Sequence, residues 1–300
     1  MLQQFNPRNA NIQIYVGDRL WPRDQARVSV FDSIVQGGDG VWEGLRVYNG
    51  RIFALDQHLQ RLRESAHALA FKNVPDEATI RDAIFATLKA NNMRDGVHIR
   101  LTLTRGEKIT SGMDPRLNQR GCTLIVLAEW KPPVYDAAGI RLITASTRRN
   151  NPRFLDSKIH HNNLLNNILA KIEANHAGAD DALMLDQEGF VAETNATNIF
   201  MCKAGSLHTP APDACLHGIT RGIVLEIARE LNIPAYERRI SLTEMYNADE
   251  VFVTGTMGEL TPVLEIDGRK ITRRYERSVL EVIQKRFRER TETEGEPLPF

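Results

Sequence analysis

The stretch from Leu155 to Asn198 constrains the fold most strongly, because it specifies a helix and two strands in immediate succession. Apolar residues recur at helical spacing and predict an amphipathic helix, with Leu164, Leu165, Ile168, Leu169 and Ile172 on one face. Asn162 or Asn163 is placed to cap the first turn of this helix, and Gly178 is placed to end it.

A strand, a turn and a second strand follow this helix. Residues 181–186 (DALMLD) predict a buried strand, residues 187–189 a turn, and residues 190–200 the returning strand. Lys158 precedes the helix and Glu193 lies on the returning strand. Neighbouring elements therefore carry an amine and a carboxylate, and we expect both to serve one ligand.

Several sequence blocks occur in a fixed order along almost the whole chain. They are GDGVWEGLRVYNG and LDQHLQRL near the amino terminus, Lys158, DALMLDQEGFVAETNATNIF with Glu193 and Asn198, HGITRG at 217–222, and TGTMGELTPV at 254–263. Together these blocks resemble the class IV (fold type IV) pyridoxal-phosphate enzymes, the family of branched-chain and D-amino-acid aminotransferases.

The resemblance implies an α+β chain with two domains. A small α/β amino-terminal domain is expected over residues 1–130, and a larger, mixed β-barrel-like domain with helices over residues 138–290. Residues 131–137 are the expected linker, because Lys131-Pro132-Pro133 interrupts the strand pattern. The polar residues 291–300 are expected to be a disordered tail.

The resemblance also implies a cofactor, pyridoxal 5'-phosphate, and assigns residues to it. Lys158 is the implied catalytic residue, which would attach the cofactor and move a proton at the substrate α-carbon. Cofactor contacts are implied for Arg61, Lys158, Glu193, Asn198, Ile219, Thr220 and Thr256. Substrate contacts are implied for Arg100, Arg105, Thr256 and Met257. No metal site is expected.

The patterns alone support plainer interpretations of these residues. Arg61 lies off the apolar stripe of its helix, which is typical of a solvated arginine. Thr220 is placed to cap a helix, and helix starts attract anions only occasionally. Lys158 is one of nine lysines. The resemblance, rather than the spacing, selects these residues.

Two arginines compete for the substrate carboxylate. Residues 97–104 alternate, so Val97, Ile99, Leu101 and Leu103 face a core and His98, Arg100, Thr102 and Thr104 face the other side. Arg100 matches an arginine strand position of branched-chain aminotransferases, whereas Thr104-Arg105-Gly106 resembles a loop of D-amino-acid aminotransferases. A guanidinium suits a planar carboxylate in either place.

Two positions depart from the family. Many relatives place a tyrosine five residues after the lysine, where this chain has Asn163, and branched-chain enzymes carry a tyrosine where this chain has Gly37. Because of these departures, the resemblance does not determine which substrate side chain the protein prefers.

The composition of the chain limits the classes of molecule that it is expected to bind. Lys plus Arg and Asp plus Glu both number 38, so no net field attracts nucleic acid or an acidic membrane. No apolar run approaches the roughly 18 residues of a membrane span, and no leader-like segment opens the sequence. Cys122, Cys202 and Cys215 lack metal-ligand spacing. We expect a cytoplasmic protein with small-molecule substrates. The resemblance implies that this protein is a homodimer.

Shorter patterns predict the remaining elements. Residues 10–31 suggest a hairpin formed by IQIYV and VSVF, and Asn49-Gly50 suggests another. Asp56 and Asp76 are each placed to cap a helix, and Ser241 with Glu244 forms a capping-box pattern.

The predicted function is a pyridoxal-phosphate-dependent aminotransferase that moves an amino group between an amino acid, with the branched-chain L-amino acids as first candidates, and 2-oxoglutarate. The alternatives are a D-amino-acid or (R)-amine transaminase, an aminodeoxychorismate lyase on the same scaffold, and a non-catalytic binding protein.

Overall fold

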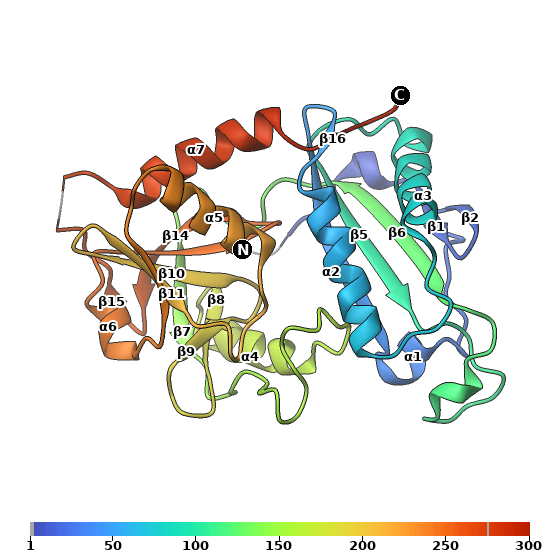
Figure 1. The fold of residues 1–300 in the computed structure, drawn as a ribbon, viewed down its shortest axis with the longest axis horizontal. Helices are drawn as coiled ribbons and strands as arrows, with labels where there is room; N and C mark the ends of the chain where they lie inside the picture. The colour runs from blue at the N-terminus through green and yellow to red at the C-terminus, as the bar shows by residue number, and fades with distance from the viewer. Residues whose placement is uncertain (1–2, 275) are drawn as a thin grey trace. The chain divides into compact units, whose positions relative to one another are not determined.

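The chain forms two units, each with its own sheet and core (Figure 1). The computed structural model describes residues 3–274 and 276–300. The amino-terminal unit comprises residues 3–132 with Ile159–Asn163 and Thr291–Phe300, and the carboxy-terminal unit comprises Pro133–Lys158 and Leu164–Arg290. The residues predicted as a linker, 131–137, are thus divided between the units.

A seven-stranded antiparallel sheet forms the amino-terminal unit, in the order β16-β4-β3-β5-β6-β1-β2. Its strands are β1 (Gln13–Val16), β2 (Arg19–Pro22), β3 (Gly40–Tyr48), β4 (Arg51–Ile52), β5 (Val97–Thr104), β6 (Thr123–Trp130) and β16 (Glu296–Pro297). The helices α2 (Leu55–Ala68) and α3 (Glu77–Ala90) pack on this sheet through one shared core (Figure 1). The short elements η1 (Pro7–Asn9), α1 (Ser33–Gly37) and η2 (Pro115–Leu117) lie in its connections.

The predicted alternation of β5 is confirmed. Its four apolar side chains are fully buried in the core, and their neighbours point to the other face of the sheet. That polar face is not open to water, since His98, Thr102 and Thr104 are also buried. In the register of β3 with β5, Glu43 lies opposite Leu101, so Glu43 shares the face that α2 covers.

A mixed sheet forms the carboxy-terminal unit, in the order β12-β11-β10-β13-β14-β7-β8-β9 with β15 beside β14. Its strands are β7 (Ile140–Thr144), β8 (Asp181–Leu185), β9 (Val191–Thr194), β10 (Asn198–Lys203), β11 (Ser206–Pro210), β12 (Ala235–Arg238), β13 (Glu250–Gly255), β14 (Glu259–Ile266) and β15 (Arg269–Lys270). The end strand β9 also contacts β10 and β11, so the sheet curls back on itself as the predicted barrel-like domain requires.

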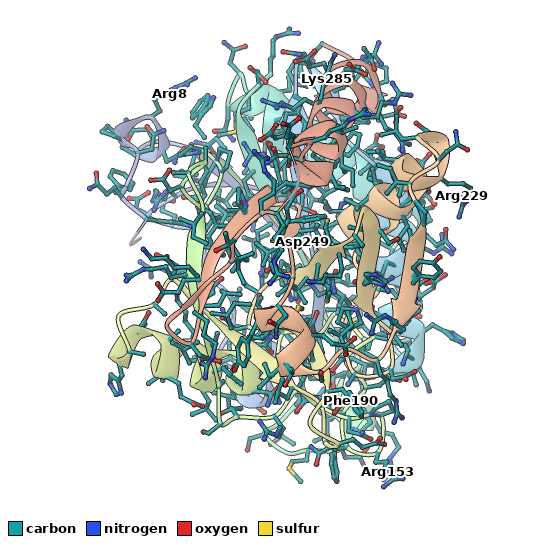
Figure 2. The ribbon with its side chains drawn as sticks, turned by 90° about the vertical axis from the view of Figure 1, so that its left-hand side faces the viewer. Arg8, Arg153, Phe190, Arg229, Asp249 and Lys285 are labelled. Atoms are coloured by element: carbon teal, nitrogen blue, oxygen red, sulfur yellow. The ribbon has the colours of Figure 1, made fainter. Side chains whose placement is uncertain are left out.

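Within the described residues, the helices that accompany this sheet are α4 (Leu165–His176), α5 (Ile219–Glu230), α6 (Leu242–Tyr246) and α7 (Val279–Thr293). Charged side chains such as Arg153, Arg229 and Lys285 project from the outside of the unit (Figure 2). No helix within residues 3–274 and 276–300 is long and apolar enough to cross a membrane.

The prediction for the start of α4 is wrong. Leu164 is the N-cap and no side chain caps the helix. The backbone nitrogen of Asn162 donates to the carbonyl of Gly40 at 2.8 Å, which ties residues 159–163 to β3, so the helix begins after them. The predicted apolar face is also turned outward, since the small residues Ala170 and Ala174 occupy the buried side instead.

Four further predictions of local structure need correction. The first hairpin returns through β2 and not through residues 28–31. Ala54, in a left-handed conformation with φ of 53°, precedes α2 in place of an Asp56 cap. Gly218 rather than Thr220 is the N-cap of α5. Residues 291–300 are not a disordered tail, because α7 continues to Thr293 and β16 pairs with β4.

Candidate active site

A buried carboxylate organises the candidate site of the carboxy-terminal unit. Glu193, on β9, accepts a 2.6 Å hydrogen bond at Oε1 from Nε of Arg149. Its Oε2 accepts hydrogen bonds from Nδ2 of Asn198 at 3.1 Å and from the backbone nitrogen of Leu216 at 3.3 Å. Burial raises the pKa of Glu193, and the charge of Arg149 is the largest influence in the opposite direction. The carboxylate is thus desolvated but firmly held.

The start of α5 packs closely against Asn198, the residue that donates to this carboxylate. A β-carbon on Gly218 would lie 1.9 Å from Oδ1 of Asn198, so a larger residue would push the helix start away from Asn198. Ile219 and Thr220 follow as the first helical residues, and Thr220 is buried. Because no side chain caps α5, its first amides are available to an anion.

Lys158 lies in the segment before α4. Its side chain is 38% exposed, and its Nζ lies 3.5 Å from Oδ1 of Asp156. One thiol links it to the Glu193 cluster: burial raises the pKa of Cys215 to about 12, Glu193 acts in the same direction, and Arg221, Arg149 and Lys158 oppose it. Lys158 and Glu193 therefore act electrostatically on the same residue.

The turn between β13 and β14 carries Thr256, which is predicted to contact both cofactor and substrate, and Met257, which is predicted to contact the substrate. Thr256 and Met257 are partly exposed there, and the carbonyl of Met257 accepts a 3.0 Å hydrogen bond from the Val134 amide. A β-carbon on Gly258 would lie 2.5 Å from the ring of Tyr135, which explains the glycine.

A buried hydroxyl lies just before this turn. Thr254 pairs with Asn198 in the register of β13 with β10, so both side chains share one sheet face. Oγ1 of Thr254 is buried and has no hydrogen-bond partner among the described residues. Such a group favours a site built to receive a polar ligand.

Arg61 belongs to a second buried charge cluster, in the amino-terminal unit. Its Nε and Nη2 donate to the two oxygens of Glu43 at 2.9 and 2.6 Å. His58 and His160 also reach Glu43, at 2.6 and 3.2 Å through their Nδ1 atoms. Arg61 is therefore not the solvated arginine that its helix pattern suggests, because its guanidinium forms an ion pair with the buried Glu43.

The two arginines that compete for a carboxylate differ in their partners. Arg105 donates to Asp39 at 2.6 and 3.2 Å and to the carbonyl of Leu69 at 2.8 Å. Arg100 stacks on Trp42, with its guanidinium carbon 3.4 Å from the ring centroid, and forms no ion pair among the described residues. Burial lowers the pKa of Arg100 to about 10, and the charge of Glu43 acts in the opposite direction. Arg105 thus fastens a loop, whereas Arg100 is free to receive an anion.

Sequence reasoning missed Arg149 and Glu43. Both are charged residues that the fold buries against partners distant in sequence: Arg149 pairs with a residue 44 positions away and Glu43 with one 18 positions away. The signal for Glu43 is its place between Val41 and Leu45 on the apolar face of an alternating strand, where a carboxylate must find a cation.

The cysteines offer no nucleophile. Burial raises the pKa of Cys122 to about 11 and that of Cys215 to about 12, and it raises the pKa of Cys202 well above its ordinary value. A thiolate is disfavoured at each position. No group of three or more His, Cys, Asp or Glu residues in the part of the chain that the structure describes is arranged to hold a metal ion.

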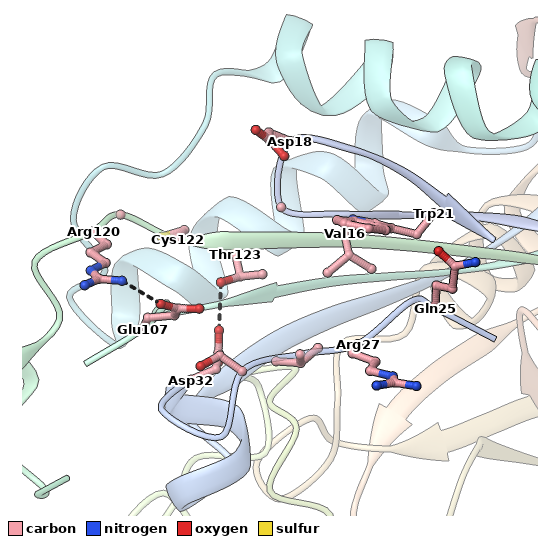
Figure 3. Close-up of a pocket in the computed structure, with 14 residues that line it drawn as sticks. Val16, Asp18, Trp21, Gln25, Arg27, Asp32, Glu107, Arg120, Cys122 and Thr123 are labelled. Carbon is pink, nitrogen blue, oxygen red and sulfur yellow. Dashed lines mark hydrogen bonds and ion pairs between the residues drawn. The ribbon is translucent and has the colours of Figure 1, made fainter. Parts of the chain in front are cut away.

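A pocket of about 540 Å³ lies in the amino-terminal unit, beside the turn between β1 and β2 (Figure 3). Its polar groups serve the fold: Asp32 accepts a hydrogen bond from Thr123 at 2.7 Å, and Arg120 pairs with Glu107 at 3.1 Å. None of the predicted site residues lines it.

Comparison with solved structures places this architecture in a known class. The T.th. branched-chain amino acid aminotransferase, solved with N-(5'-phosphopyridoxyl)-L-glutamate, superposes with a TM-score of 0.87 at 32% identity and covers 94% of either chain. The fold is therefore that of the fold type IV branched-chain aminotransferases. The sequence also matches the family described as amino-transferase class IV over residues 40–266. The chain belongs to the class IV aminotransferase family.

Two sequence relatives show how far the similarity extends. "Branched-chain-amino-acid aminotransferase-like protein 2" of Arabidopsis thaliana is 60% identical over 294 residues, which are 98% of this chain but 53% of that protein. The chain thus spans about half the length of this relative. A putative branched-chain-amino-acid aminotransferase of Methanocaldococcus jannaschii is 40% identical over 279 residues, which cover 93% of this chain and 96% of the relative.

Proposed function

We propose that the chain is a pyridoxal 5'-phosphate-dependent aminotransferase that moves an amino group between a branched-chain L-amino acid and 2-oxoglutarate. The buried Glu193 carboxylate beside the uncapped start of α5 is the observation that carries this proposal. A carboxylate and a helix start suit the two polar ends of that cofactor, its ring nitrogen and its phosphate.

The donor set of the carboxy-terminal unit fits this cofactor. Glu193 accepts three hydrogen bonds within the described residues, and a carboxylate has about four acceptor sites, so one remains for a protonated ring nitrogen. The α5 amides, with Ile219 and Thr220, would hold the phosphate, and Thr256 would add a hydroxyl. Asn198 keeps Glu193 in place through its amide.

When bound, pyridoxal 5'-phosphate supplies an electron sink that stabilises negative charge at the substrate α-carbon. Lys158 is the proposed catalytic residue, which holds the cofactor through Nζ and carries the proton at that carbon. Its partial exposure supports this role, because an incoming amine must reach it. The family resemblance proposes Arg61, whose guanidinium donates to Glu43, as a further phosphate contact.

Arg100 is the proposed receiver of a substrate carboxylate. Its guanidinium forms no ion pair with a carboxylate in the described part of the chain, and the Trp42 ring positions it. Arg105 would have to break its bonds to Asp39 and Leu69 before it could bind substrate. The amide groups at Thr256 and Met257 would bind a further carboxylate oxygen.

The proposed class of amino-acid substrate is based on the names of the relatives. The names of the Arabidopsis and Methanocaldococcus relatives refer to branched-chain amino acids, and the T.th. enzyme was solved with a phosphopyridoxyl-glutamate adduct. Glutamate is the amino form of 2-oxoglutarate, which supports 2-oxoglutarate as the acceptor.

A second copy of the chain is the proposed partner. The outward face of α4 carries Leu165, Ile168, Leu169 and Ile172, which are between 43% and 66% exposed. Helical spacing places them in one apolar stripe, and a stripe of this kind is typical of a protein interface. A homodimer would bury it.

We also propose a cytoplasmic location. Cys122, Cys202 and Cys215 are all free thiols, which suits a reducing compartment.

A panel of amino donors tests the proposed function. The purified chain, loaded with pyridoxal 5'-phosphate, would be incubated with L-leucine, D-alanine or an (R)-amine, each with 2-oxoglutarate, and glutamate would be measured. The proposal predicts glutamate from L-leucine. Glutamate from D-alanine or the (R)-amine alone would assign the chain to another transaminase class, and pyruvate release from aminodeoxychorismate would show a lyase.

A further inference from the structure

Arg149 is the cation nearest the carboxylate that the proposed cofactor would meet. It lies in the segment after β7, where its backbone nitrogen donates to the carbonyl of Leu185 at 2.9 Å. Its Nε donates to Glu193 at 2.6 Å, and its Nη1 donates to Oδ1 of Asn166 on α4 at 3.2 Å. The two paired side chains are 7% and 6% exposed, so water screens their interaction little.

The geometry leaves one part of the carboxylate for a ligand. Oε2 of Glu193 is occupied by Asn198 and Leu216, whereas Oε1 receives Arg149 alone within the described residues. A carboxylate oxygen offers about two acceptor sites. The unfilled site therefore lies on Oε1, the atom that Arg149 contacts.

We infer that Arg149 is a positioning residue that keeps Glu193 ionised and turns its Oε1 toward the ring nitrogen of bound pyridoxal 5'-phosphate. This inference rests on the proposed function. A buried carboxylate without a cation takes up a proton, and a protonated Glu193 no longer attracts the positive charge of a protonated ring nitrogen. Arg149 prevents this, and Asn166 fixes Arg149 in turn.

A purely structural ion pair would leave the same geometry. Buried ion pairs often add little stability over apolar residues of similar volume, so stability alone does not explain this one. The two roles differ in which ligands lose affinity when Arg149 is replaced. A structural role affects the binding of every ligand of this site equally, whereas the inferred role affects ligands that possess the ring nitrogen.

The test compares two ligands and three single substitutions. Dissociation constants for pyridoxal 5'-phosphate and for its 1-deaza analogue, in which CH replaces the ring nitrogen, would be measured by equilibrium dialysis on the apoprotein. The variants are Arg149→Met, Arg149→Lys and Glu193→Gln, with the double variant Arg149→Met/Glu193→Gln to complete a cycle. Circular dichroism would verify that each variant is folded.

Arg149→Met should weaken the binding of pyridoxal 5'-phosphate by about tenfold or more, the loss expected for a charge-assisted hydrogen bond. Its affinity for the 1-deaza analogue should stay within about twofold of the wild-type value. Arg149→Lys should restore part of the affinity, and Arg149→Met should have no further effect once Glu193→Gln is present. If Arg149→Met does not fold, the Arg149→Lys and Glu193→Gln pair carries the same comparison.

Three results would overturn the inference. Equal losses for both ligands would indicate a structural role, and unchanged binding of pyridoxal 5'-phosphate would indicate no role. If the wild-type chain binds neither ligand, the proposed function fails together with the inference, and this result is distinguishable because it needs no variant.

Discussion

The guanidinium of Arg61 holds the fully buried carboxylate of Glu43 through two hydrogen bonds, at 2.9 Å from Nε and 2.6 Å from Nη2. His58 and His160 contact the same carboxylate. Burial alone would raise the pKa of Glu43, but Arg61 and His160, with hydrogen bonds from both histidines, hold it well below its ordinary value. Arg61, the proposed phosphate-binding arginine, is therefore held in place by its ion pair with the buried Glu43 carboxylate.

Replacing this anion should destabilise the amino-terminal unit. Glu43→Gln leaves Arg61 without its charge partner, and breaking a buried pair in this way costs about 3 kcal/mol or more. Denaturant unfolding measures the loss. The matched control is Glu64→Gln, an exposed glutamate on the same helix as Arg61, which should change stability little. Equal effects of both substitutions would contradict the assigned role of Glu43.

The Glu43 cluster should also make stability depend on pH. Because the folded pKa of Glu43 lies below the ordinary 4.5, its contribution is complete above that pH and is lost as the pH falls toward the folded value. The unfolding free energy of Glu43→Gln should therefore change less between pH 5 and about pH 3 than that of the wild type. Parallel curves would argue against this ionisation state.

His98 should impose a separate acid sensitivity. Burial, helped by Lys131, Arg46 and Arg100, lowers its pKa from 6.5 to about 3. The unfolded chain thus takes up a proton at a higher pH than the folded chain, and stability falls as the pH drops from 6.5 toward 3. A single such histidine costs about 2 to 3 kcal/mol by pH 4.5.

Two histidine variants check this dependence. His98→Gln should reduce the fall in unfolding free energy between pH 6.5 and 4.5, and His58 and His160, whose pKa values burial also lowers, account for the remainder. His176→Gln, at the exposed end of α4, is the control and should leave the fall as it is in the wild type. If the two variants respond to pH in the same way, His98 is not the sensitive group.

The competing arginines should separate in kinetic measurements. Arg100→Gln removes the proposed carboxylate receiver, and the lost charge-assisted hydrogen bonds should lower kcat/KM by about 10- to 100-fold without a comparable loss of stability. Arg105→Gln should instead lower the Tm, because it releases Asp39 and the carbonyl of Leu69. Steady-state kinetics and thermal unfolding decide between them, and the reverse pattern would assign the substrate to Arg105.

The apolar face of α4 should control the oligomeric state. Leu165→Glu with Leu169→Glu introduces charges into the proposed interface and should give a monomer, measured by light scattering after size exclusion. Leu264→Glu is the control, since Leu264 is a similarly exposed leucine on β14. A wild-type monomer, or a dimer unaffected by the double variant, would contradict the proposed homodimer.

Elements with strong local signals could be predicted from the sequence. The alternation of β5 survives in the fold, Asp76 caps α3 through Thr79, and Ser241 with Glu244 forms the expected capping box. The alternation follows from the two-residue repeat of a strand, and in both caps the interacting groups are close in sequence, so the local pattern is sufficient.

Features that depend on distant partners could not be predicted in this way. The start of α4 is displaced because residues 159–163 bond to β3, and the last residues are ordered because β16 finds β4. Arg149 and Glu43 were missed for the same reason. Local patterns likewise do not distinguish Arg100 from Arg105, because Asp39 and Trp42, the residues that separate them, lie far away in sequence.

Covalent labelling tests the central proposal most directly. The chain would be incubated with pyridoxal 5'-phosphate, reduced with borohydride and digested, and the peptides analysed by mass spectrometry. A phosphopyridoxyl group is expected on Lys158. It should be absent from a folded Lys158→Ala variant and retained when Lys285, an exposed lysine of α7, is replaced by Ala. Labelling that is spread over surface lysines, or that persists in Lys158→Ala, would contradict it.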